Sequence, residues 1–217
     1  PPRRPAMAPG PLREGAARGL GGEEVMTEVL RAHVPGFDIG HELAVLSADE
    51  WGPGCLLNDS MAAMGVSKLE IGPWLPEDEP TGGKAAASKA RDFSSLVPTA
   101  APLPFCPRET RVTTTYCISS GLEDGRPFLL LENCSITHDV PFGDHFVLKD
   151  RVFFRSAGDG VELTKSVCVV FVKSTIFASK IVAATISEQK HAGACLLDVV
   201  REHAQVAFRG QEPRPPL

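Results

Sequence analysis

The chain has 217 residues, of which 43% are apolar and 23% are charged, and its formal net charge is −5. This length permits one large or two small domains, and we expect one, because the strands predicted between residues 89 and 173 follow one another without intervening helices. The negative charge argues against nucleic acid as a partner, and no apolar run approaches the roughly 20 residues of a membrane-spanning helix.

Both ends of the chain are predicted to lie outside the folded domain. Residues 1–22 are rich in Pro, Gly, Ala and Arg, a composition typical of a disordered linker, and residues 210–217 form a proline-rich tail. The domain is therefore expected to span residues 23–209. The chain begins Pro-Pro-Arg-Arg, with no initiator Met or signal peptide, so we expect it to be an excised segment of a longer protein.

The first third of the domain is predicted to contain short elements. Residues 23–33 can form an amphipathic helix, and residues 41–46 fit a first strand. From residue 47 to 64 the pattern is helical but is interrupted by a Gly-Pro-Gly run. Two short helices are therefore expected there, the second capped by Asn58 or Asp59.

An antiparallel sheet is predicted to follow. Strands are expected over residues 67–74, 89–95, 108–118, 126–138, 145–155 and 161–172. Short turns join the last four of them, and Gly158-Asp159-Gly160 is a strong hairpin signal. Consecutive strands joined by short turns must run antiparallel.

Two long connections interrupt the early strands. Residues 75–88 are acidic and then rich in Gly, Ala and Lys, which predicts a mobile loop. Residues 96–107 include four prolines, which lack the backbone donor of a central strand, so they also predict a loop. That second loop carries large apolar residues, which indicate contact with another molecule: Leu96, Val97, Leu103 and Phe105.

The longest predicted element is a helix that begins near Ser179 or Lys180 and reaches Arg209. Its apolar stripe consists of Val182, Ile186, Leu196, Val200, Ala204 and Ala207. At about 1.5 Å per residue the helix is roughly 45 Å long and needs a sheet of matching size. A curved antiparallel sheet closed by such a helix leaves a tapered space between them, so the sequence predicts an α+β fold with an internal cavity.

Cysteine and histidine patterns give no catalytic or metal site. The six cysteines (Cys55, Cys106, Cys117, Cys134, Cys168 and Cys195) show no zinc spacing, and we expect reduced thiols, with a disulfide between neighbouring strands as the alternative. His138-Asp139 and Asp144-His145 fit an acid–base interpretation, but turn chemistry is favoured. His203 is expected at the surface or edge of the helix end. The sequence contains no G-x-S-x-G, phosphate loop or H-E-x-x-H, so no enzyme, metal or cofactor is expected.

Several motifs between Phe37 and Arg209 together resemble one family. They are Gly72-Pro73-Trp74, Arg91 before the proline-rich loop, the run from His138 to Phe146 (HDVPFGDHF), the strand Val167–Lys173, and Lys180-Ile181 at the helix start. Their combination resembles the VASt domain, a relative of the StAR-related lipid-transfer domains. That family includes the sterol-moving Aster proteins of animals, the Lam proteins of yeast and plant cell-death regulators.

The resemblance implies a helix-grip (START-like) fold, in which a bent sheet wraps the long helix and encloses an apolar cavity for one sterol or similar lipid. It implies that the loop over residues 96–107 acts as a lid and touches membranes. It also implies a monomeric, non-catalytic domain at the cytoplasmic face of membranes, including endoplasmic reticulum contact sites, placed there by a GRAM domain or membrane anchor elsewhere in a parent protein.

A lipid carrier needs an apolar cavity and a few polar groups, because apolar surface gains roughly 25 cal/mol per Å² on leaving water while an unpaired buried polar group costs about 1–3 kcal/mol. The candidate ligand-binding residues are Trp74, Tyr116, Phe128, Leu130, Phe146, Leu148, Val152, Phe154, Val167, Val169, Gln189 and Gly193. The strand residues in this set are chosen on the expectation that they share one face of the sheet. A shift of one residue in the strand register would move each of them to the other face, away from the cavity. Gln189 bonds either a sterol hydroxyl or a neighbouring side chain, and Gly193 allows a close approach of the helix backbone.

Two functions from different classes are consistent with the sequence. The first is a lipid-transfer module that extracts a sterol from one membrane and delivers it to another. The alternative is a ligand sensor or protein-interaction scaffold without transfer activity, suggested by the long insertion at residues 75–90. A weaker third possibility is an enzyme that uses His138 or His145.

Overall fold

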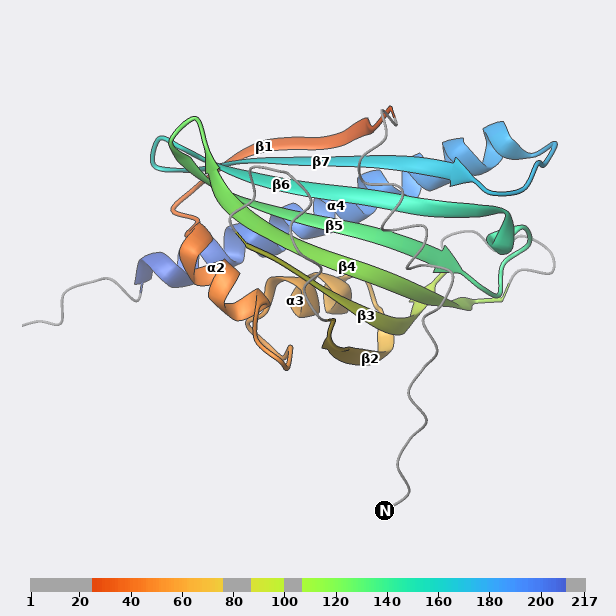
Figure 1. Ribbon diagram of the computed structural model, residues 1–217, viewed down its shortest axis with the longest axis horizontal. Helices are drawn as coiled ribbons and strands as arrows, with labels where there is room; N and C mark the ends of the chain where they lie inside the picture. The colour runs from red at the N-terminus through yellow and green to blue at the C-terminus, as the bar shows by residue number, and fades with distance from the viewer. Residues whose placement is uncertain (1–24, 76–86, 100–106, 210–217) are drawn as a thin grey trace, which may run out of the picture.

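The computed structural model describes residues 25–75, 87–99 and 107–209, which form one antiparallel sheet with helices on one face (Figure 1). The strands are β1 (Thr27–Pro35), β2 (Ser67–Trp74), β3 (Ala87–Pro98), β4 (Glu109–Glu123), β5 (Arg126–Thr137), β6 (Phe146–Ala157) and β7 (Gly160–Phe171). The helices are α2 (Ile39–Leu46), α3 (Leu56–Ala63), the one-turn η1 (Gly143–His145) and α4 (Ala178–Arg209). The fold is the predicted α+β helix-grip arrangement.

The strand order is β1-β7-β6-β5-β4-β3-β2, so β2 to β7 form a continuous meander and β1 adds to the edge beside β7. Tight turns make the meander possible. Asp124 and Gly125 both have positive φ, as the hairpin between β4 and β5 requires, and Gly158 has a φ of 60° at the turn between β6 and β7. The predicted strands from residue 67 onward are confirmed, and α4 starts within two residues of its predicted start.

The core lies between the sheet and the helices. One side of the sheet, here called the inner face, carries the buried strand residues Tyr116, Ile118, Leu129, Leu131, Val152, Phe154, Val161 and Leu163. Leu196, Val200 and Ala204 of α4 join the same cluster, and the ring of Phe37 stacks on Phe154 at a centroid distance of 5.0 Å. The C-terminal half of α4 is thus packed into the core.

His203 also anchors α4 and is not the surface histidine that we expected. Its Nδ1 lies 2.8 Å from Oε1 of Glu42 in α2, and its Nε2 lies 3.1 Å from Oδ2 of Asp59 in α3. The Glu42 side chain is only 3% exposed. One imidazole therefore ties three helices together.

Four predictions for the first 64 residues are wrong. Residues 27–35 form strand β1 rather than a helix, because their backbone pairs with β7 from Thr27↔Val167 to Pro35↔Gly160. Residues 39–46 form helix α2 rather than a strand, because the Asp38 carboxylate accepts the N–H groups of Gly40 and His41 and caps the helix. Residues 47–64 contain one helix rather than two, and this helix, α3, begins at Leu56, so Asn58 and Asp59 lie inside it.

Strand β3 extends into the segment that was predicted to be the lid loop. Leu96 and Val97 belong to β3, where Leu96 pairs with Ser67 on one side and Arg111 on the other. Pro98 ends the strand. Leu103 and Phe105 lie outside the described residues, as does most of the predicted loop over 75–88.

Two further observations concern the described part of the chain. Cys55, Cys117 and Cys195 are free thiols, as predicted. No helix in the described segments is both long and apolar enough to cross a membrane.

Candidate functional site

A row of polar and aromatic residues crosses the inner face from strand to strand. Trp74 of β2 pairs with Arg91 of β3, Arg91 with Tyr116 of β4, Tyr116 with Asn133 of β5, and Asn133 with Asp150 of β6. We call these five residues the polar row. Because paired residues point to the same face, all five side chains lie side by side beneath the helices. The sheet register alone therefore assembles a line of hydrogen-bonding groups inside an apolar core.

Arg91 is fully buried and held between two indole rings. Its guanidinium carbon lies 3.7 Å from the Trp74 ring centroid and 4.8 Å from that of Trp51. Its two terminal nitrogens donate to the backbone oxygens of Asp49, at 3.1 Å, and Ala48, at 3.3 Å. Stacking on aromatic faces and donation to carbonyls keep this cation in the core. Arg91 thereby links β3 to the connection between α2 and α3.

The other end of the polar row contains a buried ion pair. The ammonium group of Lys165 in β7 bonds Oδ2 of Asp150, and the two side chains are only 5% and 12% exposed. Burial raises the pKa of Tyr116 well above its usual value, so its hydroxyl stays protonated and can donate. This end of the row thus offers a neutral donor, a carboxylate and an ammonium group within one layer of the sheet.

Helix α4 passes over the ion pair at Gly193. A Cβ at that position would lie 3.6 Å from Cδ of Lys165 and 3.4 Å from Cβ of Leu30 in β1, which are ordinary van der Waals distances, so the helix packs on the sheet here without requiring glycine. Gln189 lies one turn before Gly193 on the same face, and its Oε1 is buried. The helix thus brings one more acceptor toward the row.

Buried polar atoms without a partner concentrate here. Among the described residues, Nε1 of Trp74, Nε of Arg91, the Tyr116 hydroxyl, Oδ1 of Asn133, Oδ1 of Asp150 and Oε1 of Gln189 are all buried with no hydrogen-bond partner in the protein. Each such atom costs about 1–3 kcal/mol, and proteins seldom leave one unpaired. Five belong to the polar row and one faces it from α4. A bound molecule with hydroxyl groups, or water, can supply the missing partners.

In β6 and β7 the polar row separates a packed half of the inner face from an open half. On one side lies the core cluster already described. On the other side the paired residues Leu148 and Val169, and then Phe146 and Phe171, are only partly buried. Across from them, Val182 and Ile186 in the first turns of α4 are also partly exposed. This open half presents apolar surface on both the sheet and the helix.

The structure brings together most of the residues predicted for the site. Trp74 and Tyr116 belong to the polar row, and Phe146, Leu148 and Val169 line the open half. Val167 is the Cα partner of Asp150 at the end of the row, and Gln189 and Gly193 face the row from α4. Val152 and Phe154 lie deeper, in the packed core.

Phe128 and Leu130 lie on the opposite face of the sheet from the other candidates. In β5 the buried residues are Leu129 and Leu131, and successive strand residues alternate between faces. Phe128 packs against Phe153 at 5.7 Å, and Leu130 lines a groove on the outer face. The expectation that they share the face of Tyr116 is therefore wrong by one residue of register.

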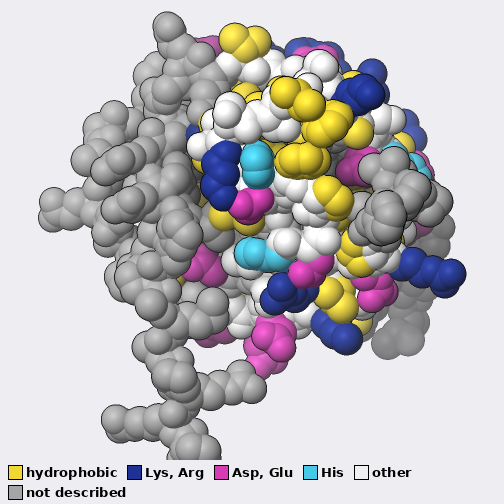
Figure 2. Space-filling model, turned by 90° about the vertical axis from the view of Figure 1, so that its right-hand side faces the viewer, with side chains coloured by type: hydrophobic (Ala, Val, Ile, Leu, Met, Phe, Trp, Pro, Cys, Tyr) yellow, Lys and Arg dark blue, Asp and Glu magenta, His cyan; other side chains and the backbone are white. Residues whose placement is uncertain are grey.

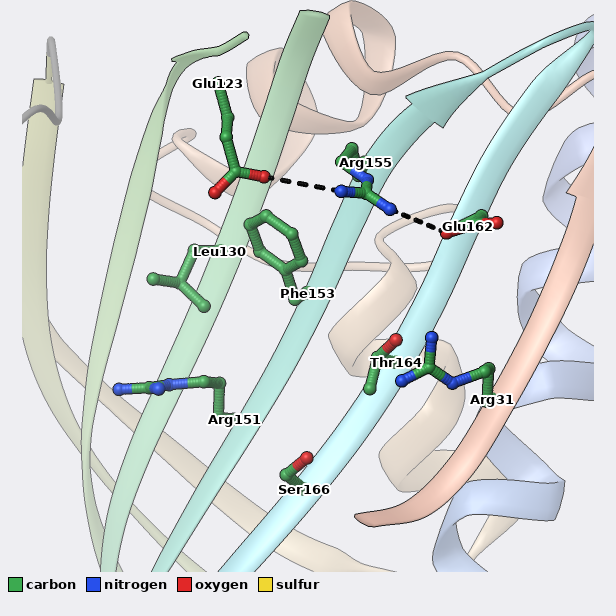
Figure 3. Close-up of a pocket in the computed structure, with 9 residues that line it drawn as sticks. All are labelled: Arg31, Glu123, Leu130, Arg151, Phe153, Arg155, Glu162, Thr164 and Ser166. Carbon is green, nitrogen blue, oxygen red and sulfur yellow. Dashed lines mark hydrogen bonds and ion pairs between the residues drawn. The ribbon is translucent and has the colours of Figure 1, made fainter. Parts of the chain in front are cut away.

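Figure 3 shows the outer groove, which has a volume of about 540 Å³ and lies on the side of the sheet away from α4. Its arginines form ion pairs with neighbouring glutamates. Arg155 contacts Glu162 at 2.9 Å and Glu123 at 3.8 Å, and Arg151 contacts Glu132 at 2.8 Å. These pairs are typical of a solvated sheet face rather than of a ligand site.

Four residues of the site were not predicted as ligand contacts: Arg91, Asn133, Asp150 and Lys165. Arg91 was singled out only by the family resemblance. A charged or amide residue in the middle of an apolar strand is a usable signal, but it becomes a site only when the strand register aligns it with its neighbours.

The aspartates of the two histidine–aspartate pairs bond basic residues of other segments. Asp139 accepts the backbone N–H of Arg111 at 2.9 Å and its side-chain nitrogen at 2.8 Å. These bonds hold the pKa of Asp139 at about 2, too low for a base near neutral pH. Asp144 bonds the ammonium group of Lys173. Both aspartates are thus engaged by basic residues distant in sequence rather than by the local turn backbone that we expected.

The sequence matches a family model described as "VAD1 Analog of StAR-related lipid transfer domain" (VASt) over residues 54–188. The chain belongs to the VASt family. The match spans the whole polar row and the open half of the sheet. Because VASt domains are related to StAR-type lipid-transfer domains, membership supports lipid binding in general, and domains of this kind are generally non-catalytic.

Comparison with other proteins adds little to the assignment of the chain to the VASt family. A search of curated proteins finds no match. Among solved structures, the crystal structure of TTHA0849 from Thermus thermophilus is similar, with 11% sequence identity and a TM-score of 0.45, over 84% of this chain and 99% of that one.

Proposed function

We propose that this VASt domain binds one hydroxyl-bearing apolar lipid, a sterol or a similar molecule, between its inner face and α4. It carries that lipid between membranes as a monomer, without catalysis, at the cytoplasmic face, including contact sites of the endoplasmic reticulum. The observation that supports this most strongly is the polar row, because it sets unpaired hydrogen-bonding atoms beside an apolar, partly open surface.

The two halves of the inner face fit the two parts of such a lipid. The apolar body would cover Leu148, Val169 and the facing turns of α4, gaining roughly 25 cal/mol per Å² of buried apolar surface. The hydroxyl would reach the polar row, where Asp150 Oδ1 and Asn133 Oδ1 accept and the Tyr116 hydroxyl donates. Leu103 and Phe105, outside the described residues, are our candidates for the lid that closes over the lipid.

The test is native mass spectrometry of the full chain with cholesterol and with cholestane, which lacks the hydroxyl. We expect one cholesterol per chain and a preference over cholestane of about tenfold or more, since cholestane leaves the row unpaired. Absence of bound sterol in a folded chain would overturn the proposal.

A double variant tests whether the polar row causes the preference. Asp150→Leu with Lys165→Met replaces both partners of the buried ion pair by apolar groups, a change that is often neutral or stabilising. It should prefer cholesterol over cholestane less strongly than the natural sequence does, because Asn133 and Tyr116 still remain. Leu130→Ala on the outer face is the matched control and should keep the preference. If the double variant keeps the full preference for cholesterol, the ion pair does not take part in recognising the hydroxyl.

The alternative is a sensor or scaffold that binds a lipid without transferring it. The side chains that fill the inner face around Arg91, Trp51 and Tyr116 favour it, because they leave less of the face for a ligand. Donor and acceptor vesicles distinguish the two functions: a transfer domain accelerates sterol exchange between them, whereas a sensor binds sterol without accelerating it.

A further inference from the structure

Exposed apolar side chains gather at one end of the molecule, where β7 runs into α4. Seven large apolar residues are exposed in the described chain, and four of them lie here: Phe142, Val172, Ile176 and Phe177. Ile176 is 91% exposed and Val172 60%. Figure 2 shows hydrophobic side chains collected on this end. We call these four residues the apolar tip.

Two segments about 30 residues apart in sequence are held together to form the tip. The Phe142 ring lies 5.3 Å from that of Phe177 and 5.3 Å from that of His145. The N–H groups of Val172 and Lys173 both donate to the His145 carbonyl, at 2.8 and 3.2 Å. The turn before β6 and the connection before α4 are therefore fixed to each other.

The backbone at Phe142 is strained in a way that keeps its ring at the surface. Its φ is 64°, in the left-handed region that bulky residues rarely adopt, at a cost of about 1–3 kcal/mol. A Cβ on the next residue, Gly143, would lie 2.2 Å from the Thr137 carbonyl oxygen, so only glycine fits there. Packing the core does not require this arrangement, because the Phe142 side chain lies at the surface.

The tip adjoins the open half of the inner face. Phe171 immediately precedes Val172, and Phe146 begins β6 just after η1; both are partly exposed on the inner face, with their rings 6.1 Å apart. Val182 lies in the first turns of α4, close in sequence to Phe177. A lipid that entered the inner face at this end would pass from the tip to the open half along apolar surface.

Charge at this end also suits a membrane. The chain as a whole carries a net charge of −5. At the tip, however, Asp139 is paired with Arg111 and Asp144 with Lys173, and Lys180 follows in the first turn of α4. This end therefore carries no net negative charge to repel anionic headgroups.

We propose that the apolar tip is the surface through which this domain touches a lipid bilayer. The inference rests on the proposed lipid-carrying function, and it places the contact on the β5–β6 turn and the β7–α4 connection. Leu96 and Val97, which the sequence assigned to this role, are strand residues of β3 instead. Exposed phenylalanine and isoleucine side chains gain free energy by entering the interfacial region of a bilayer.

The test is co-sedimentation of the full chain with vesicles of phosphatidylcholine, with and without phosphatidylserine. The variant Phe142→Asp/Ile176→Asp changes two surface side chains, and Asp tolerates the left-handed backbone at position 142. We expect the bound fraction to fall at least about tenfold, because two apolar contacts are lost and two negative charges are gained. Lys180→Glu should weaken binding more with phosphatidylserine present than without it.

Leu122→Asp and Val206→Asp are the matched controls, since these residues are 63% and 71% exposed but lie outside the tip. Both should bind vesicles as the natural sequence does. Equal loss of binding in the controls, unchanged binding in the tip variant, or no vesicle binding by the natural sequence would each overturn the proposal. In the last case the tip would be a surface for a protein partner.

A second readout separates this proposal from the proposed function. Cholesterol delivered from cyclodextrin loads the domain without any bilayer, and the tip variant should load as the natural sequence does. Failure of the natural sequence to load would count against lipid carriage, while tip-dependent vesicle binding would still support the contact surface. Normal loading combined with vesicle binding that does not depend on the tip would support lipid carriage and would count against the tip as the contact surface.

Discussion

At the scale of single residues, His203 shows how one titratable group can control the seating of a helix. It bridges Glu42 and Asp59, and the hydrogen bond with the nearly buried Glu42 raises the pKa of the imidazole, with a smaller contribution from Asp59. The raised pKa increases the protonated fraction of the ring near neutral pH. A neutral imidazole would leave a buried carboxylate without a countercharge.

The sign of the pH dependence follows from that shift. Because the pKa is higher in the folded state than the unfolded value near 6.5, the stabilisation is complete below about pH 6.5 and is lost as the pH rises through the folded pKa. His203→Gln should therefore lower the free energy of unfolding by about 1.5–3 kcal/mol at low pH and by clearly less at high pH. Urea titrations at about pH 6 and about pH 9 measure both values.

The exposed His41 of α2 provides the control, because its ring is at the surface and only its backbone contacts Asp38. His41→Gln should leave the pH profile unchanged. An identical loss of stability at both pH values in His203→Gln would mean that the bridge contributes packing rather than charge.

At the scale of elements, two glycines mark where backbones approach each other, and they differ in how much room remains. At Gly193 of α4 an added Cβ meets Leu30 Cβ at 3.4 Å, an ordinary contact. At Gly160, the first residue of β7, it would lie 2.0 Å from the backbone oxygen of Val34 in β1. The helix can thus accept a methyl group, whereas the pairing of β1 with β7 cannot.

This difference predicts opposite effects of the same substitution. Gly193→Ala should raise the free energy of unfolding by about 0.5–1 kcal/mol, because alanine favours the helix. Gly160→Ala should lower it by about 1–3 kcal/mol or more, because β1 must move. Urea unfolding of the two variants side by side measures both. A loss of stability in Gly193→Ala would show that the helix is already in its closest contact with β1 and Lys165.

The same element scale explains what the sequence could and could not predict. Alternation and turn residues identified β2 and β4 to β7, and the 3.6-residue stripe identified α4, because those signals are local. Strand β1 was read as a helix because its partner, β7, lies 125 to 140 residues away, from Pro35 opposite Gly160 to Thr27 opposite Val167. Helix α2 was read as a strand because the decisive residue, Asp38, lies outside the periodic segment.

The candidate site was less predictable than the fold because it depends on register. Residues 128–131 are all apolar, so alternation could not decide which of them face inward, and Phe128 and Leu130 were chosen in place of Leu129 and Leu131. The polar row needs the alignment of five strands. The bulges between Ser67 and Glu70 and between Ile71 and Trp74 shift that alignment, and no local pattern reveals them.

At the scale of the whole molecule, α4 is firmly held at one end and loosely held at the other. Its C-terminal half buries Leu196, Val199 and Val200 and is bridged through His203. Its N-terminal half covers the open half of the sheet with partly exposed side chains such as Val182 and Ile186. Local stability follows the number of buried apolar contacts, so the two halves should differ in how often they open.

Hydrogen exchange would show this asymmetry and its dependence on the ligand. Without lipid, amides of residues 181–190 should exchange about tenfold or more faster than those of residues 196–204. A sterol bound between the open half and α4 stabilises only the state in which that half is closed. At a sterol concentration a hundredfold above Kd this stabilisation is about 2.7 kcal/mol, which slows hydrogen exchange at residues 181–190 roughly a hundredfold. Exchange at residues 196–204 should change less, because these residues are already packed into the core. Equal protection of both halves without lipid would mean that the inner face is closed along its whole length, which would favour the scaffold over the carrier.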